Sequence, residues 1–346
     1  MSAREYTVNR TYPPVGTQFA ARWYTSGYTW ASSYPLTVLM SETLPDATAH
    51  IWPQLKLARG MLDSGRAFPH AFIRSALFST RQFSGGAVRE VATAATPIAI
   101  DKLSNYGFAQ VAGVRLDQGD CDVYVWLLNR AYQRGLAGKS EARIFFTREE
   151  ALSERGLARG TKNFRLFHQS LMRLYDADIS YLTPYATGRT RLISSIEVPK
   201  AEEKKKYDYE VIISAKVGDF FHENDFRLLQ NDERAKLKDY LSKWLHAFYS
   251  SHDKPIYDSR GEPILYSCDR IKSLTDRAKT PEREWREKLD AALAHVREVT
   301  GWREFKVVLK TGRPDRISIK KGERRFPKQK KIVDESGAGA AAESAS

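Results

Sequence analysis

The sequence predicts a mainly helical α+β fold in which one supersecondary unit occurs twice in tandem. Two stretches of the chain repeat one order of elements, namely helix, short strand, short helix, longer helix and β-hairpin. The 346 residues also exceed the size at which a single core stops growing, about 250–300 residues. We therefore expect two folded domains, at 71–200 and 201–320.

The two ends of the chain are expected to lie outside these domains. Residues 1–70 are rich in Tyr, Thr, Ser and Pro with weak periodicity, which predicts a flexible leader. Residues 321–346 begin with basic residues, including Lys328, Lys330 and Lys331, and end in a Gly/Ala/Ser-rich stretch that cannot bury a core. This segment predicts a disordered tail.

The composition indicates a partner of negative charge. The chain has 55 Lys and Arg against 42 Asp and Glu, a formal net charge of +13, and such a field attracts nucleic acid or an anionic membrane surface. No apolar stretch approaches the ~20 residues needed to span a bilayer, so we expect a cytoplasmic protein without a membrane role. Cys121 and Cys268 fall one in each domain and are expected to be buried thiols.

The first copy of the unit begins with residues 120–134, whose apolar side chains recur at helical spacing. Residues 142–146 form a predicted strand. Thr147 then caps a short helix that ends near Gly156, because its hydroxyl can accept a free backbone N–H. A longer helix starts near Thr161. Two β-rich segments follow at 178–185 and 190–198, joined by 186–189, and predict a hairpin.

The second copy repeats this order. Pro281 suits the first position of its long helix, where the missing N–H is harmless, and Ser267 suits the cap of its short helix. A helix–turn–helix followed by a hairpin is the winged-helix arrangement, in which the second helix enters the DNA major groove. The expected elements are a helix at 232–251, a strand at 264–266, helices at 268–277 and 280–299, and a hairpin of 305–309 and 316–320.

Basic and polar residues at these helix starts and hairpins are the candidates for DNA contact. Arg283 and Arg286 are the base-reading candidates, since the arginine fork matches guanine O6 and N7. The alternative is that they form the solvated face of an amphipathic helix. In the first domain, phosphate contacts are as plausible as base readout. The full set is Arg159, Thr161, Lys162, Asn163, Arg165, Arg189, Arg191, Lys272, Lys279, Thr280, Arg283 and Arg286.

No catalytic residue, metal site or cofactor is expected. A DNA-nicking replication enzyme would need closely spaced metal-binding histidines, and the seven histidines are scattered. Asp117, Asp120 and Asp122 have metal-like spacing, but acids at a helix N-terminus explain them better, since they stabilise the helix dipole.

Four segments, at 74–81 (RSALFSTR), 111–131, 240–255 (YLSKWLHAFYSSHDKP) and 284–287 (EWRE), resemble in matching order the TrfA-type replication initiators of broad-host-range plasmids. The resemblance implies a protein that binds origin repeats (iterons) in double-stranded DNA and helps to open adjacent AT-rich DNA, which becomes single-stranded. It also implies recruitment of host DnaA and the replicative helicase, and self-dimers as the inactive form.

The family's sliding-clamp motif, of the type Gln-Leu-Ser-Leu-Phe, has Gln54-Leu55-Lys56-Leu57-Ala58 as its counterpart. Gln54, Leu55 and Leu57 are therefore clamp-binding candidates. The terminal aromatic residue is missing, so an amphipathic turn after Pro53 is the favoured alternative.

Two other functions remain open at this point. One is a winged-helix transcriptional repressor, which as a two-fold dimer would read an operator palindrome. The other is a nicking enzyme, which the scattered histidines disfavour. Direct repeats beside an AT-rich stretch near the gene would favour initiation instead.

Overall fold

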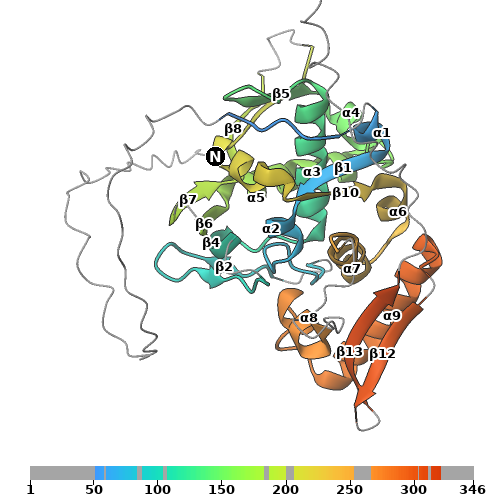
Figure 1. The fold of residues 1–346 in the computed structure, drawn as a ribbon. Helices are drawn as coiled ribbons and strands as arrows, with labels where there is room; N and C mark the ends of the chain where they lie inside the picture. The colour runs from blue at the N-terminus through green and yellow to red at the C-terminus, as the bar shows by residue number, and fades with distance from the viewer. Residues whose placement is uncertain are drawn as a thin grey trace, which may run out of the picture. The chain divides into compact units, whose positions relative to one another are not determined.

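The computed structural model describes residues 51–320 except 58–59, 84–87, 104–106, 183–186, 200–205, 253–265, 303 and 311–312. These residues combine helices and antiparallel sheets in an α+β fold, as the sequence predicts (Figure 1). They belong to one compact unit. Residues 1–50 of the expected leader and the whole expected tail at 321–346 lie outside the described residues.

The first copy of the repeated unit begins with a helix that its own residues cap. Asp117 accepts the backbone N–H groups of Gly119 and Asp120, and Thr147 caps the short helix in the same way. Because these caps satisfy donors that a helix start leaves free, they fix where each helix begins. The elements are α3 (Gln118–Gln133), β5 (Ala142–Phe146), α4 (Arg148–Ser153), α5 (Thr161–Asp176), β8 (Ile193–Glu197) and β9 (Tyr209–Ile213).

The second copy has the same order of elements and the same strand order in its sheet. In the first copy the strands lie in the order β5-β9-β8, and in the second in the order β11-β13-β12. In both, the strand before the two helices pairs with the last strand of the hairpin. The elements are α7 (Tyr240–Ser250), β11 (Tyr266–Ser267), α8 (Cys268–Leu274), α9 (Glu282–Thr300), β12 (Glu304–Lys310) and β13 (Arg313–Lys320).

The hairpin expected as the first wing, from 178–185 and 190–198, is corrected by the structure. β6 (Asp178–Leu182) and β7 (Thr187–Arg191) do pair, but they extend another sheet, in the order β2-β4-β6-β7 with β3 also beside β4. Leu192 and Ile193 are both fully buried, so the chain leaves one sheet and enters the other at this point. The other strands are β2 (Val91–Ala92), β3 (Ile98–Ala99) and β4 (Gly107–Val114).

The domain boundary expected at residue 200 is also corrected. β9 pairs with β5 from Ala142↔Ile213 to Phe146↔Tyr209, so the first copy needs residues up to Ile213 to complete its sheet. The helix expected at 232–251 is divided into α6 (Asn231–Lys236) and α7, because Leu237 is buried between them and Asp239 caps α7 by accepting the N–H of Ser242.

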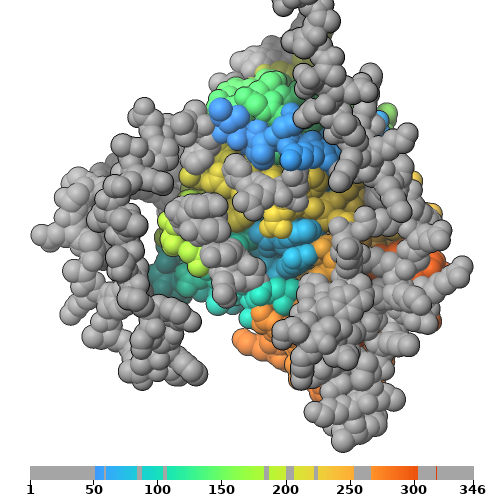
Figure 2. Space-filling view, in the orientation of Figure 1, coloured from blue at the N-terminus to red at the C-terminus, as the bar shows by residue number. Residues whose placement is uncertain are grey.

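The N-terminal described segment is part of the core, which corrects the leader expected up to residue 70. β1 (Gly65–Pro69) pairs antiparallel with β10 (Phe226–Gln230), and Trp52 and Phe68 are each only 1% exposed. Figure 2 shows this segment, in blue, against residues coloured yellow. Burial of two large aromatic side chains explains why this stretch folds despite its weak periodicity.

The remaining helices of the described residues are short. They are α1 (Met61–Ser64), α2 (His70–Ile73) and the 3-10 helix η1 (Ala215–Asn224).

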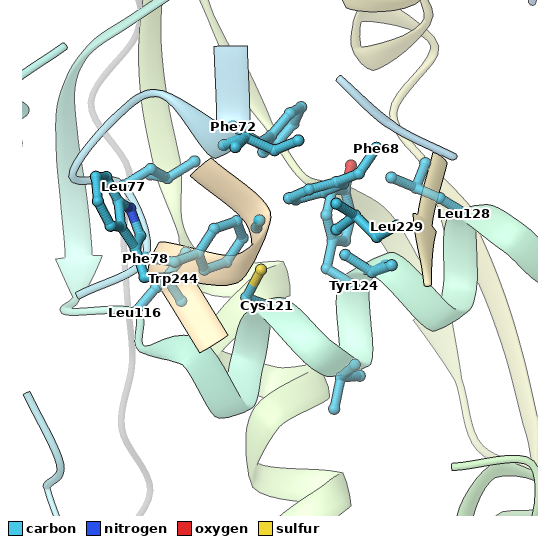
Figure 3. Packing of buried hydrophobic residues seen from close by; sticks show 14 of the residues in the cluster. Phe68, Phe72, Leu77, Phe78, Leu116, Cys121, Tyr124, Leu128, Leu229 and Trp244 are labelled. Carbon is cyan, nitrogen blue, oxygen red and sulfur yellow. The ribbon is translucent and has the colours of Figure 1, made fainter. Parts of the chain in front are cut away.

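An aromatic cluster lies at the centre of the core. The ring of Phe72 lies 4.5 Å from that of Phe108 and 5.6 Å from that of Tyr124 on α3. Phe68 and Phe78 pack beside it, as Figure 3 shows. Cys121 and Cys268 are both buried free thiols, as the sequence predicts.

Candidate nucleic-acid interface

The turn between α4 and α5 is held by glycines and one side chain. Gly156 adopts a φ of 67°, a left-handed conformation that favours glycine, and the chain turns back toward α5. Asn163, in the first turn of α5, donates its side-chain N–H to the carbonyl of Ala158 at 2.7 Å. Asn163 therefore fixes the turn, which is a structural role for one of the DNA-contact candidates.

The outward face of α5 is cationic and carries no carboxylate near its start. Phe167, Leu171 and Leu174 are buried, which turns the opposite face of the helix to solvent. The first turn has no acidic residue, and Asp176 at the last position is the only carboxylate of the helix. The exposed residues of this face, spaced by three and four, are Lys162, Arg165, Leu166 and Gln169.

The cations at this face have no ion partner within the described part of the chain. Arg159, Lys162 and Arg165 are exposed and take part in none of its ion pairs, and Thr161 is exposed beside them. By contrast Arg173, further along α5, is bound to Asp120 at 2.7 Å. The unpaired charges thus gather in the first half of α5, the end from which a recognition helix contacts base edges.

The predicted wing residues Arg189 and Arg191 lie on β7, outside the β5-β9-β8 sheet. Arg189 donates to the carboxylate of Asp178 at 2.6 and 3.2 Å, and the guanidinium of Arg191 lies 5.2 Å from the ring centre of Tyr175. The hairpin that does complete the first copy is β8–β9. Its connection carries lysines at 204–206, of which the described one, Lys206, is exposed.

Three of the four cations of α9, namely Arg283, Arg286 and Lys288, pair with carboxylates one turn away. Arg283 pairs with Glu287 at 3.0 Å and Arg286 with Glu282 at 2.7 Å. The helix carries five carboxylates against four Lys and Arg. Two other candidates differ: Lys272 pairs with Glu282 at 3.2 Å, whereas Lys279 is exposed.

The glutamates at the start of α9 are held in their charged form. Burial raises the pKa of Glu282, but the hydrogen bond from Lys272 and the charge of Arg286 outweigh it, so its pKa lies below the usual value. The hydrogen bond from Lys288 lowers the pKa of Glu284. α9 begins at Glu282, and Pro281 is its N-cap and not its first helical residue as expected. The N–H of Thr280 donates to the carbonyl of Arg277 at 2.8 Å.

The three aspartates with metal-like spacing are bound by cationic side chains. Asp120 accepts from Arg173 and from the hydroxyl of Ser170. Asp122 binds Arg234 of α6 at 2.7 Å and Lys243 of α7 at 2.5 Å, and these charges outweigh burial, so the pKa of Asp122 lies well below its usual value.

Asp117, the third of these aspartates, has a perturbed pKa. Burial and the charge of Asp120 raise the pKa of Asp117 to about 6, although Arg89 opposes this shift. The spacing of the three aspartates is therefore explained by a helix cap and by ion pairs.

The clamp-binding candidates lie partly inside the fold. Leu55 is 6% exposed and Leu57 packs against the core, whereas Gln54 is exposed. Nearby, the N–H of Trp52 donates to the carbonyl of Lys139 at 2.9 Å. Binding of a partner through Leu55 would require this side chain to leave the core.

Comparisons with known proteins give only a weak structural similarity. No family model matches the chain, and no curated protein matches it. A crystal structure of selenomethionine derivatives of domains 2 and 3 of RctB is 11% identical with a TM-score of 0.40, covering 66% of this chain and 94% of that one. A second structure of RctB domains 2–3 is 12% identical with a TM-score of 0.37, covering 59% and 80%. Similarity of this size does not identify a function.

In the part of the chain that the structure describes, no helix has both the length and the apolar character of a transmembrane segment.

Leu166 is the residue of this surface that the sequence reasoning missed. It falls between the partly buried Phe164 and the buried Phe167 in the chain, yet it is 47% exposed. The helical spacing in the sequence does indicate its exposure, since Leu166 lies outside the apolar seam of Phe164, Phe167, Leu171 and Leu174.

Proposed function

We propose that the chain is a replication initiator that binds double-stranded DNA sequence-specifically through two winged-helix units, with α5 as its main reading helix. The observation that carries this proposal is the first half of α5, where Lys162 and Arg165 are exposed and unpaired among the described residues. DNA affinity arises largely from cations that neutralise phosphates, and a helix after a tight turn is the element that fits the major groove.

The repeated topology supports the assignment of both units. Each has a helix–turn–helix followed by a hairpin, and each places the strand before the helices beside the last strand of that hairpin. This is the element order of the winged helix. In this proposal β8–β9 and β12–β13 are the wings, and the exposed Lys206 beside β9 contacts the phosphate backbone.

The identity of the DNA site is proposed from the sequence resemblance at 74–81, 111–131, 240–255 and 284–287. On this basis the protein binds direct repeats at a plasmid origin, promotes opening of adjacent AT-rich DNA, and recruits host DnaA and the replicative helicase. Dimers would be its inactive form. The protein is proposed to act without catalytic chemistry or a cofactor.

Footprinting of the full-length protein on the DNA around its own gene tests the proposal. At about 150 mM salt with competitor DNA, we expect phased protection of several direct repeats. Protection of one palindrome over a promoter would instead indicate a repressor. Binding without any sequence preference would contradict both the initiator and the role of α5.

A further inference from the structure

Leu166 stands out among the exposed apolar side chains. Within the described residues, the large hydrophobic side chains that are exposed are Ile51, Val88, Val91, Leu157, Leu166 and Val198, and of these only Leu166 lies in a helix. A helix in water normally turns such a residue inward, as α5 does with Phe167 and Leu171. Leu166 is therefore available to an apolar group of a partner.

The surroundings of Leu166 restrict what that partner can be. Arg165 precedes it, and Lys162 and Gln169 lie one turn before and after it on the same exposed face. Neighbours of this kind bind phosphates and the polar edges of bases. A leucine among them offers no hydrogen bond, so it needs an apolar atom within a polyanionic surface. In the major groove the thymine C5-methyl group is that atom.

We propose that Leu166 reads a thymine by contact with its C5-methyl group, while the cations beside it hold the helix in the groove. This inference rests on the proposed DNA-binding function of α5. It makes Leu166 a residue that determines sequence specificity, and it distinguishes α5 from a helix that binds phosphates alone.

Substitution of thymine by deoxyuridine tests the contact, because it removes only the methyl group. Duplexes are first selected from a random library by the full-length wild-type protein. Each thymine of the selected site is then replaced singly by deoxyuridine, and the Kd is measured at about 150 mM salt for wild type and Leu166→Ala. For the wild type we expect one position at which the replacement weakens binding about fourfold, the effect of one buried methyl group.

Leu166→Ala is expected to bind the thymine and deoxyuridine duplexes equally, with a Kd near that of the wild type on deoxyuridine. Val91→Ala, which removes an exposed apolar side chain from β2, should keep the full discrimination. Thermal unfolding of both variants checks that each is folded.

The outcomes separate the inference from the function on which it rests. A wild type that selects a defined site but tolerates every thymine replacement overturns the role of Leu166 and leaves DNA reading by α5 intact. Discrimination that persists in Leu166→Ala does the same. If no sequence is selected at all, the proposed function fails and the inference fails with it.

Discussion

The two copies of the repeated unit have the same topology but differ in the ion pairing of the cations on their longer helices. Each pairs the strand before its helices with the last strand of its hairpin, but α5 presents unpaired cations where α9 presents cations neutralised by glutamates. Element order identifies a helix that can enter a groove, whereas the charge around each cation decides whether that helix favours DNA. The carboxylates four residues from Arg283 and Arg286 carry this information in the sequence itself.

The ion pairs on α9 contribute little free energy, but the charge of their glutamates still affects DNA binding. An exposed ion pair between residues four apart contributes only about 0.3–0.5 kcal/mol, so Arg283 can exchange Glu287 for a phosphate at little cost. The glutamates remain in place after such an exchange, and their negative charge opposes the DNA backbone. We therefore expect the first unit to supply most of the affinity.

The largest effect is expected where the two units are joined. Asp122 of α3 binds Arg234 of α6 and Lys243 of α7, and Arg234 is almost completely buried. Asp122→Asn should lower the free energy of unfolding by about 3–5 kcal/mol, because it leaves a buried cation without its charge partner. Urea denaturation at pH 7 measures this loss. Asp178→Asn, which breaks the exposed pair with Arg189, is the control and should cost less than about 1 kcal/mol.

The same pair should show a defined pH dependence. The pKa of Asp122 is lower in the folded than in the unfolded protein, so its stabilisation is complete above the unfolded pKa of about 3.9 and is lost as the pH falls below it. The difference in stability between wild type and Asp122→Asn should therefore shrink between pH 5 and pH 3. A difference that is constant across this range would mean that the ion pairs are not its source.

The second effect, on DNA binding, distinguishes α5 from α9 as the proposed reading helix. Arg165→Ala should weaken specific binding by about 1–3 kcal/mol and relax discrimination at one base pair. Arg283→Ala should leave both the affinity and the specificity close to those of the wild type, because the carboxylates around this arginine oppose the DNA backbone and keep the contribution of α9 small. Gel shifts on a selected duplex and on single-base variants of it give both quantities. The reverse ranking would make α9 the main reading helix.

A third effect follows if the glutamates keep α9 from the DNA. Replacement of Glu282 and Glu287 by Gln removes the carboxylates that pair with Arg286 and Arg283, and we expect tighter binding to any duplex. The dependence of log K on log salt should steepen by about 0.9 for each arginine that reaches a phosphate. Lys288 retains its partner Glu284 in this variant and serves as an internal control. An unchanged salt slope would place α9 away from the DNA.

The smallest effect is expected on β7. Arg189 is held by Asp178 in a sheet that does not include the β8–β9 hairpin, so Arg189→Ala should change stability by no more than about 0.5 kcal/mol. Its DNA affinity should match that of the wild type. A uniform loss of DNA affinity on all sequences, with a weaker dependence of log K on log salt, would instead indicate that β7 contacts the DNA backbone.

Local signals in the sequence predict the helices well and the sheets poorly. The start of α5 at Thr161 and the caps at Thr147 and Ser267 are confirmed, because each depends on neighbouring residues alone. The strand at 142–146 is also confirmed, although its partner β9 is distant in the sequence. The prediction of the first wing is wrong. Residues 190–198 have the pattern of one strand, but the buried pair Leu192 and Ile193 divides them between two sheets.

Long-range pairing and charge matching explain the remaining differences. β1 pairs with a strand more than 150 residues away, and no local pattern announces such a partner. The sequence predicts the candidate site as a set of basic and polar residues, and the structure shows that some are exposed, some are ion-paired and one holds a turn. Burial of Phe167 determines which face of α5 is exposed, and ion pairs such as that of Arg286 with Glu282 determine which cations are neutralised.

The pairing of β1 with β10 also sets an order of events during synthesis of the chain. Gly65 lies opposite Gln230, so the strand at 65–69 leaves the ribosome long before its partner exists. Until β10 has been synthesised, the backbone N–H and C=O groups of β1 lack their strand partner, and the side chain of Phe68 is not fully buried. Contacts of such high sequence separation form slowly, since loop closure must precede them. Pairing of β1 therefore awaits residue 230, and a nascent chain that is shorter than this exposes an unpaired strand edge to aggregation.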